Sequence, residues 1–134
     1  MFKGSIVALI TPFYNDKLDE ENYRNLIHYH LKNGTHGVVP GGTTGESPTL
    51  SHNEHKKIIE ISIKETKGKI PVIAGTGSNS TTEAIELSKY AEKVGSDGLL
   101  IVTPYYNKPT QEGLYQHYKK INDNVGIPII IYNI

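Results

Sequence analysis

Side chains with hydroxyl or amide groups directly follow three of the apolar runs in this 134-residue sequence. These side chains are Thr43, Thr44, Tyr105, Tyr106, Tyr132 and Asn133. Hydroxyl groups that lie next to one another can pass a proton along, so a threonine–tyrosine–tyrosine chain would suit general acid–base catalysis. The alternative is that the tyrosines are amphipathic residues at a surface rim, and the residue types alone leave both interpretations open.

The sequence GGTTGES at residues 41–47 is the most distinctive of these segments. Its glycines allow the backbone to approach a small molecule closely. The two threonine hydroxyls and the amide N–H groups of the loop form a donor set suited to an anion such as a carboxylate. A tight connection with glycines at positive φ is the other interpretation of the same pattern.

A lysine suited to Schiff-base chemistry is not evident. Such a lysine needs a pKa lowered by burial in an apolar site. The chain has 13 lysines, and none lies inside an apolar run. Lys108 alone lies beside the hydroxyl-bearing segments, on a polar loop.

Metal and nucleotide sites are not predicted either. His52 and His55 stand three residues apart with Glu54 between them, which does not match the zinc-binding pattern H-E-x-x-H. Residues 75–80 lack the third glycine of G-x-G-x-x-G, and the loop at 41–47 has no Walker lysine. We therefore expect no metal and no cofactor.

The elements that position these residues alternate regularly. Apolar runs typical of buried parallel strands recur about every 30 residues, and helix-period patterns with capping signals lie between them. The predicted strands are residues 5–10, 37–40, 70–74, 98–102 and 127–132. The predicted helices are residues 19–34, 51–68 and 80–95, and a fourth that carries Leu114, Tyr118 and Ile121 and stops before Gly126.

This βαβαβαβαβ pattern predicts an α/β fold with parallel strands and right-handed crossovers. Five strands could form a flavodoxin-like sheet, or the first half of a (β/α)₈ TIM barrel, which needs about 200–250 residues. The apolar run that closes at Tyr132 has no further helix to cover it. That favours the half barrel, with residues 1–134 as a single partial domain of five strands and four helices without an internal boundary.

Composition excludes several classes of function. The 14 basic residues balance the 14 acidic ones, so nothing indicates binding to nucleic acid or to an anionic membrane. The chain has no cysteine for a disulfide or a thiolate nucleophile. Its first residues lack the features of a signal peptide, and no apolar run approaches the roughly 20 residues of a membrane span. We expect a cytoplasmic protein.

Four segments resemble the signature of the dihydrodipicolinate synthase / N-acetylneuraminate lyase family. They are GVVPGGTTGE at residues 37–46, PVIAGTG at 71–77, VTPYYN at 102–107 and IYN at 131–133. The resemblance runs without a gap along the whole chain. The threonine pair at 43–44 and the segment QEGLYQH at 111–117 resemble the synthase branch.

The resemblance implies a TIM barrel that joins pyruvate to aspartate semialdehyde in the diaminopimelate pathway of lysine biosynthesis. Thr43 and Thr44 would bind the pyruvate carboxylate, and Thr44, Tyr106 and Tyr132 would form the proton relay. Tyr106 would reach into a neighbouring subunit, which implies a homodimer or homotetramer. The lysine that forms the Schiff base would lie beyond Ile134, so this chain is predicted to be inactive alone.

The resemblance also implies, more weakly, an allosteric site for the end product lysine. Its residues would be Ser47, Pro48, His52, His55, Asn79, Glu83 and Tyr105. The alternative is that these are helix-cap residues, because Glu83 completes a capping box with Ser80.

Other functions remain open from the sequence. The chain could belong to a lyase for N-acetylneuraminate or a 2-keto-3-deoxy sugar acid. It could be a non-catalytic half barrel that associates with itself or binds pyruvate weakly, or, as an outsider, a flavodoxin-like nucleotide binder.

Overall fold

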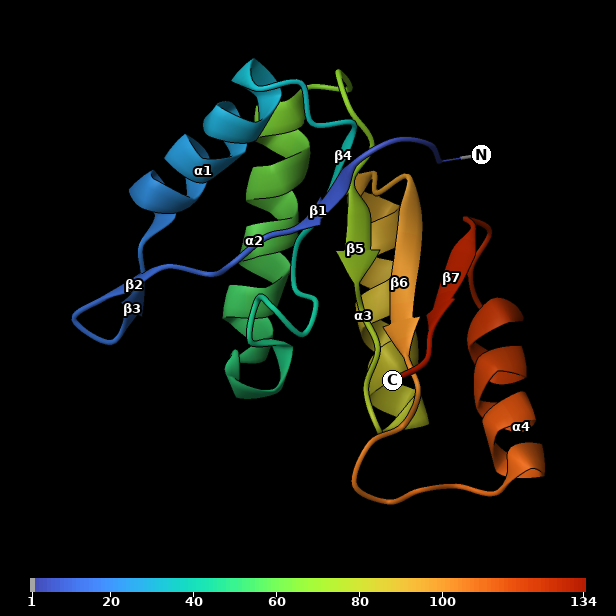
Figure 1. The fold of residues 1–134 in the computed structure, drawn as a ribbon. Helices are drawn as coiled ribbons and strands as arrows, with labels where there is room; N and C mark the ends of the chain where they lie inside the picture. The colour runs from blue at the N-terminus through green and yellow to red at the C-terminus, as the bar shows by residue number, and fades with distance from the viewer. Residues whose placement is uncertain (1) are drawn as a thin grey trace.

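Five parallel strands form the sheet in the computed structural model, which describes residues 2–134 (Figure 1). In chain order they are β1 (Ile6–Ala8), β4 (Gly37–Val39), β5 (Ile73–Gly75), β6 (Gly98–Val102) and β7 (Ile129–Tyr132). β1 pairs with β4, and β5, β6 and β7 form a second ladder. A parallel bridge between Val38 and Val72 connects the two ladders. Strand order in space therefore follows strand order in the chain.

This order decides between the two predicted architectures. A flavodoxin-like sheet has the order 2-1-3-4-5, which places the first strand in the interior. Here β1 lies at the edge and, among the described strands, pairs only with β4. Each crossover thus steps to the next strand in the same direction, as in a (β/α)₈ barrel. The flavodoxin-like alternative is wrong.

Four α-helices accompany the strands: α1 (Glu20–Lys32), α2 (His52–Thr66), α3 (Thr81–Val94) and α4 (Gln111–Asn122). They pack on one another in chain order, α1 on α2, α2 on α3 and α3 on α4. The predicted capping box of α2 is present, because Ser51 accepts from the Glu54 N–H while the Glu54 carboxylate accepts from the Ser51 N–H. The Ser51 hydroxyl also donates to the Glu54 carboxylate at 2.7 Å, and this bond, together with the one from the Ser51 N–H, lowers the pKa of the Glu54 carboxyl.

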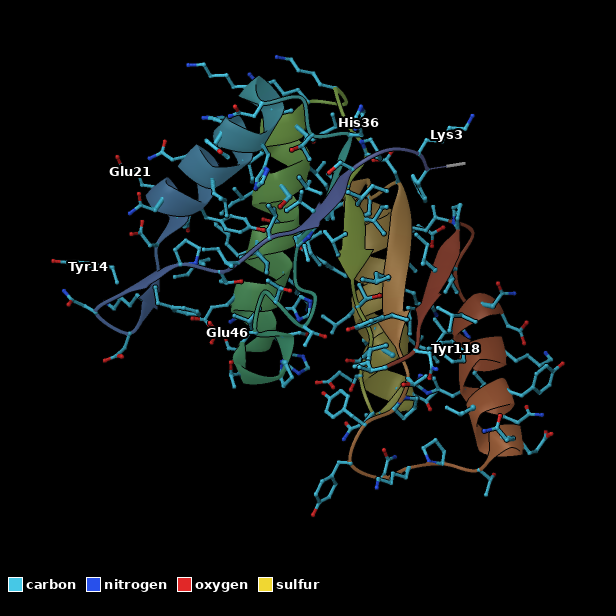
Figure 2. The ribbon with its side chains drawn as sticks, viewed as in Figure 1. Lys3, Tyr14, Glu21, His36, Glu46 and Tyr118 are labelled. Carbon is cyan, nitrogen blue, oxygen red and sulfur yellow. The ribbon has the colours of Figure 1, made fainter. Side chains whose placement is uncertain are left out.

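The core lies between the helices and one face of the sheet. Ile58 and Ile61 of α2 pack into a cluster that includes Leu9 of the first strand end. Ile59 points into a second cluster with Leu99 of β6. Figure 2 shows Tyr118 on the side of α4 that faces the sheet, and its hydroxyl donates to the Ile101 carbonyl at 3.2 Å.

Two details differ from the predictions. The strands are shorter than predicted: β1 covers three of the residues 5–10, and β5 begins at Ile73 rather than at residue 70. A β-hairpin, β2 (Phe13–Tyr14) and β3 (Lys17–Leu18), was not predicted. Its turn residues Asn15 and Asp16 have φ of 50° and 58°, typical of a type I′ turn. The hairpin projects from the body with Tyr14 near its tip (Figure 2).

Candidate active site at the carboxyl ends of the strands

A cavity of about 240 Å³ opens where the carboxyl ends of β4, β5, β6 and β7 meet. This edge of a parallel sheet is where α/β folds bind their ligands. The lining residues are Gly41, Gly42, Thr43, Ser47, Pro48, Gly75, Gly77, Leu100, Val102, Tyr105, Tyr132 and Ile134. The fold therefore brings Thr43, Tyr105 and Tyr132, which are far apart in the sequence, to one cavity.

The loop 41–47 is closed by its own backbone hydrogen bonds. The Gly45 N–H donates to the Gly42 carbonyl at 3.0 Å, and the Glu46 N–H donates to the Thr43 carbonyl at 3.1 Å. Among the described residues, the N–H groups of Thr43 and Thr44 donate no hydrogen bond. Two adjacent N–H groups without a partner in a turn are the kind of backbone donor set that binds an anion.

Glycine is required where this loop crosses β5. A Cβ atom on Gly75 would lie 2.5 Å from the Gly41 carbonyl oxygen, which is backbone and cannot rotate away. Gly41 has φ of 67°, and a Cβ there would lie 2.5 Å from Nε2 of His55. Close backbone packing therefore fixes the loop against β5 and His55.

Two of the predicted relay residues lie away from this cavity within the chain. Thr44 is exposed and does not line the cavity. Tyr106 is 92% exposed and has φ of 69°. Tyr105, its neighbour, lines the cavity instead. Asn133 is exposed as well.

A second cavity, of about 210 Å³, lies between the start of α2 and the start of α3. Six of the seven residues predicted for an effector line it, namely Ser47, Pro48, His52, His55, Glu83 and Tyr105. Asn79 does not line it, and its carbonyl accepts a hydrogen bond from the Asn107 side chain at 3.4 Å. The two cavities share Ser47, Pro48, Gly77 and Tyr105 as a common wall.

Glu83 is the charged centre of the second cavity. Its Oε1 lies 2.7 Å from Nε2 of His52, and its Oε2 accepts from the Ser78 hydroxyl. The Ser80 N–H donates to Ser78, so Glu83 does not close the predicted capping box and is left facing the cavity. Ser78 was not predicted to belong to the site, since no helix or strand period marks it.

His55 forms the buried side of the second cavity. Its Nε2 lies 2.6 Å from the Gly75 carbonyl oxygen, so the imidazole donates to that oxygen. Burial lowers the pKa of His55, and the imidazole is therefore held neutral near pH 7.

We also searched the described residues for a Schiff-base lysine, a metal site and a membrane-spanning helix. Neither cavity is lined by a lysine, and Lys108 is exposed. Residues 2–134 contain no group of three or more His, Cys, Asp or Glu side chains that could hold a metal ion. No α-helix of this part of the chain combines the length and apolar character needed to cross a bilayer.

Comparisons with known proteins agree with this geometry. The dihydrodipicolinate synthetase family model matches residues 1–134. A 4-hydroxy-tetrahydrodipicolinate synthase from Pelagibacter ubique is 72% identical over 100% of this chain and 46% of its own length. The chain thus spans about half the length of the curated relatives it matches.

Two of the solved relatives were crystallised with a ligand. One is a chloride-inhibited dihydrodipicolinate synthase from Acinetobacter baumannii in complex with pyruvate, 52% identical with a TM-score of 0.98, which covers 100% of this chain and 46% of that one. The other is a dihydrodipicolinate synthase from Cyanidioschyzon merolae with lysine bound, 40% identical with a TM-score of 0.94, which covers 99% of this chain and 46% of that one.

Proposed function

The chain belongs to the dihydrodipicolinate synthetase family, and from this premise we propose that it supplies the pyruvate-binding part of a lyase that condenses pyruvate with aspartate semialdehyde. The observation that carries the proposal is the cavity at the strand ends, which both Thr43 of the loop 41–47 and Tyr132 line, and the loop has two N–H groups without a partner in the described part of the chain. Pyruvate is a small anion, and its carboxylate suits this donor set. A relative that matches along the whole chain is described in complex with pyruvate.

In this proposal Thr43 and Thr44 bind the carboxylate through N–H and hydroxyl groups. Isothermal titration calorimetry of the chain with pyruvate tests this. Thr43→Val removes one hydroxyl donor at the cavity, and we expect it to weaken binding about tenfold. Thr82→Val, on the exposed side of α3, is the matched control and should bind as the unaltered chain does. Equal binding by all three proteins would contradict the proposal.

We propose further that these 134 residues do not form a Schiff base by themselves, because no lysine lines the cavity. Borohydride reduction in the presence of radiolabelled pyruvate checks this, with no covalent label expected on the chain. Stable label on any lysine would contradict it. On the complete enzyme, a substrate panel with N-acetylneuraminate and 2-keto-3-deoxy sugar acids separates the synthase from a sister lyase activity.

We propose that Thr44, Tyr106 and Tyr132 form the proton relay only in an assembly, with residues 1–134 as one partial barrel domain. The exposed position of Tyr106 supports a role across an interface between copies. Light scattering should give about twice the 14.9 kDa mass of one chain. Tyr106→Glu should abolish that dimer. If Ile131→Lys abolishes it instead, the association runs through the edge strand β7, where Ile131 is 59% exposed, and the relay proposal fails.

The second cavity favours a regulatory ligand, which we propose to be lysine. Glu83 would hold an ammonium group, and Tyr105 and Ser47 would offer hydroxyls to a carboxylate. The relative with lysine bound supports this choice. Glu83→Gln should weaken lysine binding at least tenfold in calorimetry while pyruvate binding stays within about twofold. Unchanged lysine affinity in this variant would contradict the assignment.

A further inference from the structure

Thr11 connects the first strand end to the loop 41–47. The residue follows β1 and is only 5% exposed. Its hydroxyl donates to the Gly45 carbonyl oxygen at 2.7 Å, across 34 residues of sequence. A buried threonine hydroxyl that donates to a distant loop carbonyl holds that carbonyl in one orientation, since a lost partner would leave a buried acceptor unsatisfied.

The loop is also seated closely on the end of β1. A Cβ atom on Gly45 would lie 2.9 Å from the Leu9 carbonyl oxygen and 3.3 Å from the Thr11 hydroxyl oxygen. Leu9 in turn donates from its N–H to the Val39 carbonyl at 3.0 Å, just before the loop begins. The loop therefore leaves β4 and folds back onto the neighbouring strand, where Thr11 meets it.

The orientation of the Gly45 carbonyl bears on the free N–H groups. Across a planar trans peptide the C=O and the following N–H point in opposite directions. Because the Gly42 and Thr43 carbonyls accept bonds inside the turn, the N–H groups of Thr43 and Thr44 point away from it. The Gly45 carbonyl accepts from Thr11 and shares its peptide with the Glu46 N–H, which donates to the Thr43 carbonyl at 3.1 Å. The bond from Thr11 therefore also constrains the peptide that joins Thr43 to Thr44.

We propose that Thr11 is a positioning residue for the anion-binding loop: it touches no substrate and orients the N–H groups of Thr43 and Thr44. The proposal rests on the proposed function of that loop. Thr11 lies outside both cavities. Substitutions that remove its hydroxyl should therefore weaken the order of the loop and carboxylate binding, whereas substitutions that change only its volume should not.

Amide hydrogen exchange of the intact chain tests the structural part. Thr11→Val keeps the shape and removes the donor, and exchange at the Gly45 and Glu46 N–H groups should become about tenfold faster. Thr11→Ser keeps the hydroxyl and should stay within about threefold of the unaltered chain. Thr66→Val makes the same substitution at a buried threonine of α2, where it removes a part-buried bond from the Thr66 hydroxyl to the Ile63 carbonyl at 3.2 Å, and it should leave the loop unchanged. Unaltered loop exchange in Thr11→Val would overturn the proposal.

Ligand binding separates positioning from general loosening. Pyruvate carries a carboxylate and pyruvamide does not. The ratio of their affinities therefore measures how well the loop N–H groups are oriented to bind a carboxylate. We expect Thr11→Val to reduce this ratio about tenfold, while Thr66→Val leaves it unchanged. An equal loss for both ligands would overturn the positioning role. If the unaltered chain binds neither ligand, the proposed function fails, and the exchange experiment alone decides whether Thr11 orients the loop.

Discussion

Two loops at the same edge of the sheet are built in opposite ways. The loop 41–47 packs against three neighbours: the end of β1, the end of β5 and the imidazole of His55. The loop 103–110 has few internal hydrogen bonds, one of them from the Asn107 N–H to the Tyr105 carbonyl at 2.9 Å, and it exposes Tyr106 to solvent. The first loop is thus preorganised by its own chain, and the second presents a side chain outward. A carboxylate site needs the first property, and a contact between molecules needs the second.

The packing of the first loop should be the most sensitive to change. Gly75→Ala places a Cβ within 2.5–2.7 Å of three backbone atoms of Gly41 and Gly42. We expect the free energy of unfolding to fall by about 3 kcal/mol, measured by urea denaturation. Gly42→Ala is the control in the same loop, because its Cβ would meet only Val39 at 3.6 Å. A loss below about 1 kcal/mol for Gly75→Ala would mean that the loop is not held as described.

Acidification should destabilise the folded chain through two buried histidines, one beside the first loop and one in the helix that follows the second. Burial lowers the pKa values of His55, beside the first loop, and of His117 in α4. Below pH 6.5 the unfolded chain therefore binds more protons than the folded one, and stability falls with pH by at most about 1.4 kcal/mol per pH unit for each histidine.

Urea denaturation between pH 7 and pH 5 measures this slope. His117→Gln should remove the contribution of His117 to this slope. In the folded chain, Nδ1 of His117 lies 2.9 Å from the Thr81 hydroxyl. A slope that His117→Gln does not change would show that α4 does not depend on the neutral imidazole.

The second loop should tolerate change that the first does not. Tyr106 has φ of 69° and is 92% exposed, so its side chain buries little. Tyr106→Gly relieves the left-handed conformation but increases the entropy of the unfolded chain. We expect the free energy of unfolding to change by less than about 1 kcal/mol in either direction. A decrease in the free energy of unfolding of more than about 2 kcal/mol would show that the two loops do not differ in this way.

Much of this arrangement could be predicted from the sequence. The apolar runs and helix periods gave the order of the strands and helices, and the loop 41–47 was recognisable from its glycines and threonines. Parallel strands collect their carboxyl ends at one edge, so the meeting of Thr43 and Tyr132 followed from the element order alone.

Other features depend on contacts that no local pattern encodes. The hydroxyl of Thr11 reaches Gly45 only because β1 and β4 are neighbours in the sheet. In the sequence, the pair Thr11-Pro12 indicates only the end of a strand. The Ser78 hydroxyl accepts the hydrogen bond from the Ser80 N–H, whereas the capping pattern predicted that the Glu83 carboxylate would accept it. The Asn-Asp turn of the hairpin was a local signal that could have been found.

The most direct test of a preformed carboxylate site is an NMR titration of the ¹⁵N-labelled chain with pyruvate. A preformed site predicts saturable shifts that are largest at the N–H groups of Thr43 and Thr44, with little change in the loop 103–110. The largest shifts elsewhere in the chain, or none at Thr43 and Thr44 at saturating pyruvate, would contradict it.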